Sequence, residues 1–146
     1  MASIVVAVDG SENADRALEY AIDYAKRYGA ALHAIYVEPE MAPPRALEQY
    51  ARAEHIPDTP SAIYHAIGES LLDRLVDRAE DAGVDKVERH TAHGDAAKGI
   101  VDLADRLDAD AVILGSRGFS EMRGLLLGSV SMKVQAHAPC TVITVR

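Results

Sequence analysis

The chain has 146 residues, of which 49% are apolar, and a formal net charge of −8 at pH 7. This length fits a single domain with one core, and the apolar content is typical of a globular chain rather than a disordered one. The negative charge argues against a general nucleic-acid-binding protein, because such proteins present a basic face to the phosphates.

The sequence also argues against a membrane or secreted protein. No apolar run approaches the roughly 20 residues that cross a bilayer. The N-terminal segment MASIVVAVDG lacks the basic start of a signal peptide, and its apolar run ends at Asp9. Cys140 is the only cysteine, so no intramolecular disulfide can form. We therefore expect a cytoplasmic protein without membrane association.

The first third of the chain predicts a β-α-β unit. Ser3–Val8 is a valine-rich apolar run, as in a strand that is covered on both faces. Glu12–Tyr28 repeats apolar residues at helical spacing, and Gly29 is suited to end that helix. Ala31–Val37 is the second strand. A right-handed crossover makes the two strands parallel.

Residues 38–60 differ from the rest of the chain because they hold five of the six prolines. Residues 46–53 within this segment predict one short helix. A connection of this length is often a functional flap, and a surface excursion without a role is the alternative.

The remaining sequence continues to alternate between helices and strands. We expect, in order, a helix at Ser61–Ala82, a polar edge strand at Lys86–Ala92, a helix capped by Asp95, a strand at Ala111–Leu114, a helix from about Ser129 to Ala136 and a last strand at Thr141–Val145. Five strands alternating with four helices predict a single doubly wound α/β domain over residues 1–146, with a parallel sheet and helices on both faces.

The segment GSRGFSEMRGLLLGSVS, residues 115–131, is the main functional candidate. It follows a predicted strand and leads into a predicted helix, an arrangement that directs backbone N–H groups toward a phosphate. Its glycines allow close approach of the backbone, Ser129 and Ser131 offer hydroxyls, and Arg117 offers positive charge. The alternative is a set of turn glycines. The spacing matches neither a Walker A loop nor the dinucleotide fingerprint.

The spacing G-x2-G-x9-G-S in this loop resembles the nucleotide loop of the universal stress protein family. The resemblance extends to IVVAVDGS near the N-terminus, IYVEP at 35–39, GDAAKGI at 94–100 and the closing APCTVITVR. Ala96 departs from the pattern, since family members often have proline there. Both residues suit a first helical turn.

The resemblance implies an adenine nucleotide alpha hydrolase-like fold with strand order 3-2-1-4-5, in which strands one and four are adjacent where the order reverses. Ligands of such sheets bind outside the carboxyl ends of the strands at that point. The family implies that ATP binds there. Its adenosine would contact Ala7, Asp9 and the backbone of Val37, and its ribose and phosphates would contact Gly115, Arg117, Gly118, Gly128, Ser129, Val130 and Ser131. Arg117 occupies a position where the family varies.

Asp9 follows the first strand, so its carboxylate can accept hydrogen bonds from a ribose hydroxyl or an adenine amine. The alternative role is to cap the first helix. We favour nucleotide contact because the neighbouring Ser11 can serve as the cap.

No catalytic or protein-built metal site is predicted. The six histidines show neither H-x-x-x-H nor HExxH spacing. A magnesium or manganese ion could accompany the phosphates, held mainly by them and by water. No nucleophile and base pair is recognisable, and Ser116 lacks the G-x-S-x-G context.

The predicted function is that of an ATP-binding, dimeric stress-response regulator whose ligand state is sensed by unknown protein partners. As in the family, two copies would pair through the apolar edge strand Thr141–Val145. The alternatives are a slow nucleotide hydrolase or phosphotransferase, or a nucleotide-free dimeric adaptor. A flavodoxin-like flavin site is disfavoured, since the acids in DGSENAD after the first strand would repel a phosphate.

Overall fold

The computed structural model describes residues 2–118 and 128–146. Its elements follow one another as β1 (Ser3–Ala7), α1 (Glu12–Tyr28), β2 (Ala31–Glu38), α2 (Arg45–Ala53), α3 (Pro60–Asp81), β3 (Val87–His93), α4 (Ala96–Arg106), β4 (Ala111–Gly115), α5 (Ser129–His137) and β5 (Thr141–Val145). These bounds agree with the predicted elements to within one or two residues at most ends.

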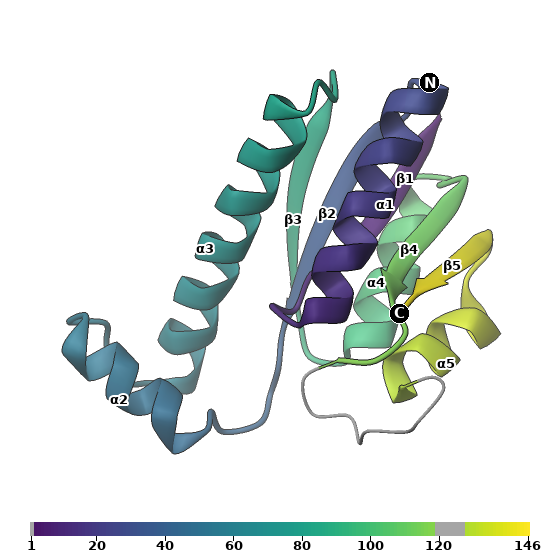
Figure 1. Cartoon of the computed structure of the whole chain (residues 1–146). Coiled ribbons are helices and arrows are strands. Elements are labelled where there is room, and N and C mark those ends of the chain that lie inside the picture. Colours follow the sequence, from purple (N-terminus) through teal and green to yellow (C-terminus); the bar gives the residue numbers. More distant parts are fainter. Residues whose placement is uncertain (1, 119–127) are drawn as a thin grey trace.

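The strands of the described residues form one parallel sheet in the order β3-β2-β1-β4-β5, which confirms the predicted topology (Figure 1). Ile4 in β1 pairs with Leu32 of β2 on one side and with Ala111 of β4 on the other. The order of strands along the sheet therefore reverses between β1 and β4. The polar strand β3 lies at one edge, as predicted, and β5 lies at the other.

Helices cover both faces of the sheet because successive strand residues point to opposite sides. One core cluster joins β1 and β2 to α1 and α3; among its buried members are Ile4, Val6, Leu32, Leu18, Ile22, Leu72 and Leu75. The second cluster lies under α4 and α5; among its buried members are Val5, Ile35, Val112, Ile100, Leu103 and Val134. The central strands are consequently buried on both faces.

Local hydrogen bonds explain where the helices begin and end. The side chains of Ser11 and Asp95 accept bonds from the backbone N–H three residues later, at 3.2 and 2.9 Å, and so cap α1 and α4. Thr59 caps α3 in the same way, so this helix begins at Pro60, one residue before the predicted start. Gly29 ends α1 in the left-handed conformation, with φ of 64°.

The proline-rich segment after β2 contains one short helix, α2, close to its predicted position. Figure 1 shows α2 beside the first turns of α3, beyond the carboxyl ends of the strands. Ala51 is its buried residue, while Tyr50 is exposed. The role of this segment as a flap stays a prediction. No helix in the described part of the chain combines the length and apolar character needed to cross a membrane.

Candidate functional site

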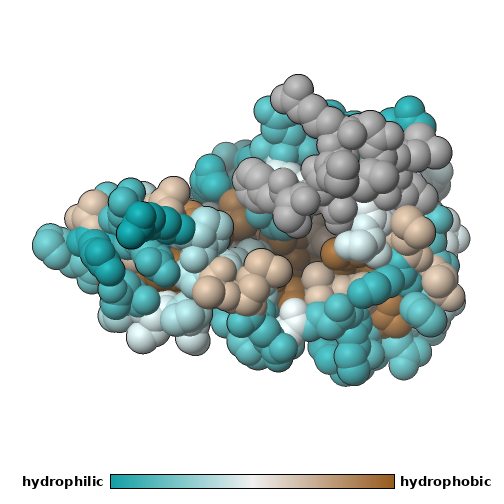
Figure 2. Space-filling model, turned by 90° about the horizontal axis from the view of Figure 1, so that it is seen from below, coloured by the Kyte–Doolittle hydropathy of each residue, from teal (hydrophilic) through white to brown (hydrophobic). Residues whose placement is uncertain are grey.

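The candidate site is the crevice at the carboxyl ends of β1 and β4, where topology places a ligand in this kind of sheet. Figure 2 views the molecule from that end and shows a hollow with apolar residues at its base. Asp9 and Gly118, which follow the two strands, are close neighbours: a Cβ placed on Gly118 would lie 2.8 Å from Oδ2 of Asp9. The two predicted ligand-binding loops therefore meet.

The carboxylate of Asp9 is shared between the turn and the crevice. Its Oδ1 accepts a hydrogen bond from the backbone N–H of Ser11 at 2.8 Å, while Oδ2 faces Gly118. The hydroxyl of Ser11 accepts from Ala14 N–H and caps α1. The cap is therefore Ser11, and one oxygen of Asp9 is directed toward the opposite loop.

Gly115 has a packing reason to be glycine. A Cβ at this position would lie 2.8 Å from Cβ of Asn13 and 2.9 Å from its carbonyl carbon, both in the first turn of α1. The Asn13 backbone cannot move aside without shifting the helix. The absence of a side chain at Gly115 thus lets the end of β4 approach α1, independently of any phosphate.

The ends of the loop at residues 115–131 are joined by hydrogen bonds. The backbone N–H of Gly128 donates to Ser116 O at 2.6 Å. The buried hydroxyl of Ser131 donates to Gly115 O at 2.8 Å and to Ser116 O at 3.0 Å. These bonds hold the start of α5 against the end of β4. The middle of the loop, residues 119–127, lies outside the described residues.

The first turn of α5 has the features of an anion-binding helix end. Gly128 is its N-cap, in an extended conformation and without a side-chain cap hydrogen bond. Ser129 is exposed, while the side chain of Val130 packs toward the core beneath α4 and α5. Any contact of Val130 with a ligand would therefore involve its backbone. A helix N-terminus carries partial positive charge that favours an anion.

The backbone of Val37 faces the crevice. In a parallel ladder, the polar groups of alternate residues point to opposite neighbours: Val8 N–H donates to Ile35 O on the β1 side, and Gly94 N–H donates to Glu38 O on the β3 side. The same alternation turns the N–H and C=O of Val37 toward β1, beyond its last paired residue. Ala7, at the end of β1, is partly buried in the core under α4.

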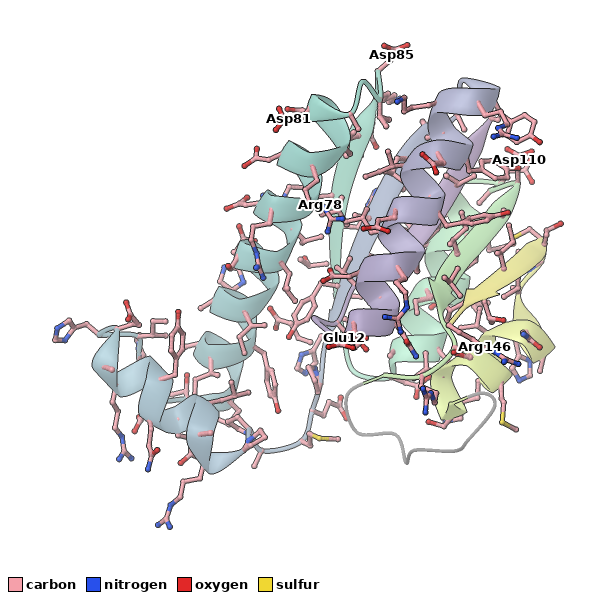
Figure 3. The ribbon with its side chains drawn as sticks, in the orientation of Figure 1. Glu12, Arg78, Asp81, Asp85, Asp110 and Arg146 are labelled. Carbon is pink, nitrogen blue, oxygen red and sulfur yellow. The ribbon has the colours of Figure 1, made fainter. Side chains whose placement is uncertain are left out.

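Charged groups of both signs lie at the crevice end of the molecule. Figure 3 shows Glu12 at the start of α1 and Arg146 after β5 at this end of the molecule, whereas Asp81, Asp85 and Asp110 lie at the opposite end. Arg117 is half-buried in the loop after β4. Arg16 is engaged elsewhere, since it donates to Asn13 Oδ1 and, at 2.5 Å, to Arg146 O.

Tyr36 lies behind the crevice, on the face of β2 that α3 covers. Burial raises the pKa of its phenol to about 12, and the carboxylates of Glu38 and Asp9 add to the rise. Sequence reasoning did not select Tyr36, Asn13 or Ser116, because polar residues at strand and helix ends carry no signal of what they will contact.

A second group was also missed, because spacing along the chain did not indicate it. His33, Glu88 and His90 come together from β2 and β3. Register between neighbouring strands places them, and no short sequence motif describes that relationship.

Comparisons with known proteins agree with this architecture. The model of the universal stress protein family matches residues 1–146. A universal stress protein of Methanocaldococcus jannaschii is 32% identical over 143 residues, covering 98% of this chain and 81% of the relative. The universal stress protein YxiE of Bacillus subtilis is 31% identical over 145 residues, covering 98% of this chain and 97% of the relative.

Solved structures show the same similarity. The universal stress protein UspA of Lactobacillus plantarum superimposes with a TM-score of 0.80 at 26% identity, covering 99% of this chain and 97% of that one. A universal stress protein in complex with cAMP gives 0.73 at 28% identity, with coverages of 99% and 97%. One from Archaeoglobus fulgidus in complex with dAMP gives 0.67 at 25% identity, with coverages of 100% and 98%.

Proposed function

The chain belongs to the universal stress protein family, and from this premise we propose that it binds ATP in the crevice between β1 and β4. The observation that carries the proposal is the meeting of Asp9 and Gly118 at the carboxyl ends of these strands. The complexes of similar proteins with cAMP and dAMP support an adenine nucleotide as the ligand class.

Each side of the crevice has its own role in this proposal. Adenosine lies between the ends of β1 and β2, where Asp9 accepts from ribose hydroxyls and the Val37 backbone pairs with the base. The triphosphate lies at the start of α5, whose partial positive charge complements it. The loop contributes Gly115, Arg117, Gly118, Gly128, Ser129, Val130 and Ser131 to the ribose and phosphates. A magnesium or manganese ion would be held by the phosphates and water.

The hydroxyl of Ser131 has a supporting role in this arrangement. Because it already donates to the carbonyls of Gly115 and Ser116, it holds the loop in position and offers a phosphate its backbone N–H rather than its hydroxyl proton. The same division applies to Val130, whose side chain faces the core.

We propose that the bound nucleotide is a regulatory ligand rather than a substrate in rapid turnover. Efficient phosphoryl transfer needs a group that orients the attacking water and charges that stabilise the transition state. Asp9 Oδ1 is engaged with Ser11 N–H in the turn, which leaves one carboxylate oxygen for the ligand. Ligand occupancy would then be sensed by partner proteins in a stress response.

We also propose that the protein is a homodimer formed through β5. This strand is a sheet edge in the described residues, and its apolar residues Val142, Ile143 and Val145 are only partly buried. An exposed apolar edge favours pairing with the same strand of a second copy about a two-fold axis.

The experiment is to purify the protein without added nucleotide, denature it and analyse the supernatant by mass spectrometry. We expect adenine nucleotide close to one per chain. For protein freed of nucleotide, Mg-ATP at about a hundredfold excess over its dissociation constant should add about 2.7 kcal/mol of stability. Absence of both the nucleotide and the thermal shift would overturn the proposal.

A pair of variants locates the site. Gly128→Val places a side chain at the buried start of α5 in a backbone conformation that valine can adopt, so binding should be lost, and far-UV circular dichroism checks that the fold is retained. Gln135→Val adds the same side chain at an exposed position of the same helix and should bind normally. If Gly128→Val bound the nucleotide with normal affinity, the phosphates could not bind at the N-terminus of α5.

A further inference from the structure

Three metal-ligating side chains converge between β2 and β3, apart from the nucleotide crevice. Nδ1 of His33 lies 3.0 Å from Nε2 of His90 and 3.4 Å from Oε2 of Glu88. The three ligand atoms lie within 4.8 Å of one another. Among the described residues, this is the one group of three or more histidine, cysteine or acidic side chains that comes together so closely.

Strand register produces this convergence. His33 pairs with Glu88, and Ile35 pairs with His90, so residues from both strands project from the same face of the sheet. Ile35 belongs to the core under α4, which places the group on the α4 face. His33 is 4% exposed, and Glu88 and His90 are half-buried. His33 is therefore fixed in the core, while Glu88 and His90 are accessible to solvent.

Two of the three ligand-atom separations are close to those of a tetrahedral transition-metal site. Zinc binds histidine nitrogens at about 2.0–2.1 Å, so the ligand atoms of a tetrahedral site are about 3.3–3.4 Å apart. The separations of 3.0 and 3.4 Å from His33 Nδ1 are close to that value. Three protein ligands leave a fourth position for water or an external ligand.

One proton is shared between Nδ1 of His33 and Nε2 of His90, and the tautomers decide which of the two nitrogens donates it. Oε2 of Glu88 lies on the other side of the same His33 nitrogen. A cation at the common centre would accept electron pairs from all three atoms.

The electrostatic surroundings select the kind of metal. Lys86 pairs with the other oxygen of Glu88, Oε1, at 3.3 Å, and Arg106 of α4 is a second nearby cation. With so little net negative charge, the site does not suit magnesium or calcium, which need several oxygen ligands. Two imidazoles and one carboxylate suit zinc.

A cleft gives access to the open side. It has a volume of about 460 Å³ between β3 and α4, and His90, Asp102 and Arg106 are among its lining residues. His90 therefore belongs both to the three-residue group and to the wall of a solvent-filled space. A metal held by His90 would adjoin this cleft.

We propose that His33, Glu88 and His90 form a zinc site that links the edge strand β3 to β2, with its fourth position open to the cleft beside α4. His33 is the third residue of β2, near the amino-terminal end of the strand, whereas the nucleotide crevice lies at the carboxyl end. The zinc site is thus independent of the proposed nucleotide function, and either can fail without the other.

The test is a titration of chelator-treated, nucleotide-free protein with Zn²⁺ in competition with a chromophoric chelator. We expect one equivalent bound per chain and a rise in the melting temperature. Co²⁺ in place of Zn²⁺ should give the intense visible absorption of a tetrahedral ion. Glu88→Gln and His90→Gln should each weaken Zn²⁺ binding by more than the about 10–100-fold typical of losing an outer-shell partner.

The variants are placed on the half-buried positions because a change at buried His33 could unfold the protein. Matched controls are His65→Gln and His93→Gln, whose side chains are 65% and 60% exposed beside Glu38; both should bind Zn²⁺ as the parent does. The proposal is overturned if the parent binds no stoichiometric zinc, or if Glu88→Gln and His90→Gln bind it unchanged. Equal losses in the controls would also overturn it.

Discussion

The ring of Tyr36 fills the space in front of Gly68, where α3 crosses β2. A Cβ placed on Gly68 would lie 2.3 Å from Cδ1 of Tyr36 and 2.7 Å from Cε1. Tyr36 is 5% exposed and belongs to the core cluster under α1 and α3, so other core side chains surround its ring. The contact fixes how closely α3 approaches the sheet, and with it the position of the proline-rich segment that precedes α3.

We predict that Gly68→Ala destabilises the protein, although the same change usually stabilises a helix. Alanine is favoured over glycine in a helix interior by about 1 kcal/mol. Overpacking a core costs about 1–3 kcal/mol, and a 2.3 Å approach to a buried ring belongs at the upper end of that range. The free energy of unfolding, measured by urea titration, should fall by about 1–2 kcal/mol.

Gly99 provides a graded comparison in α4. A Cβ there would meet Val37 Cγ2 at 3.0 Å and Ala92 Cβ at 3.3 Å, a much milder crowding. Gly99→Ala should therefore cost clearly less than Gly68→Ala. Tyr36→Leu removes the ring that a side chain at Gly68 would meet. Gly68→Ala should therefore cost less stability in the Tyr36→Leu background than in the parent. If Gly68→Ala alone stabilised the protein, the result would contradict the close packing of Tyr36 against Gly68.

A second prediction concerns the dependence of stability on pH. Burial raises the pKa of Tyr36 from 10.0 to about 12. Between these values the unfolded chain releases the phenol proton and the folded chain keeps it, so the folded state binds more protons and stability falls as pH rises. The stability that Tyr36 contributes is complete below about pH 10 and is lost as pH approaches about 12.

The comparison is between the parent and Tyr36→Phe, by urea titration near pH 9 and near pH 11. The parent should lose more stability over this interval than the phenylalanine variant, which has no proton to release. Equal losses would mean that Tyr36 ionises at an ordinary pKa.

The sequence predicted the alternation of strands and helices because buried parallel strands and amphipathic helices have distinct apolar periods. The strand order was available only through the family resemblance. Gly115 shows the limit of motif reasoning. Its place in the loop indicated a phosphate site, yet Asn13 leaves no room for a Cβ at this position. Phosphate binding and close packing both call for glycine here, and the motif does not distinguish between them.

Contacts between segments that lie far apart in the chain could not be predicted from the sequence. His33 and His90 are 57 residues apart, and they meet because β2 and β3 pair in a register that no local pattern specifies. The contact between Tyr36 and Gly68 is of the same kind, since a helical glycine gives no sign of the side chain that will face it.

A third prediction tests the proposed dimer. Ser116 N–H donates to Val145 O at 2.7 Å, so the polar groups of Val145 point toward β4 and those of the adjacent Thr144 point outward. Thr144→Pro removes an outward N–H without removing a bond to β4, and proline is tolerated in edge strands. The variant should keep the fold and have the mass of a monomer in light scattering.

The matched control is Thr144→Val, which keeps the backbone N–H and should remain dimeric. A monomeric parent, or a Thr144→Pro variant that is still dimeric, would contradict pairing through this strand.

The last prediction uses the closeness of Asp9 to Gly118. Gly118 is not among the positive-φ glycines, and among the described residues the atom nearest to its absent side chain is Oδ2 of Asp9, at 2.8 Å. Alanine at this position can therefore be accommodated by rotating the carboxylate, and stability should fall by at most about 1 kcal/mol, the typical net contribution of the one hydrogen bond from Ser11 N–H that the rotation strains. The rotation removes Oδ2 from the place where a ribose hydroxyl would bind, so the affinity for ATP should fall by about tenfold, which is about 1.4 kcal/mol.

Calorimetry on four proteins separates the two residues: the parent, Gly118→Ala, Asp9→Ala and the double variant. If alanine at Gly118 acts by displacing Asp9, it should have little further effect once Asp9 is gone, and the two losses should not add. Inorganic triphosphate serves as a ligand without adenosine, and Asp9→Ala should weaken its binding less than that of ATP, because the proposed complex places Asp9 against the ribose. Equal losses for both ligands would mean that Asp9 only stabilises the turn before α1 through Ser11 N–H, and the adenosine would then have to be placed elsewhere in the crevice.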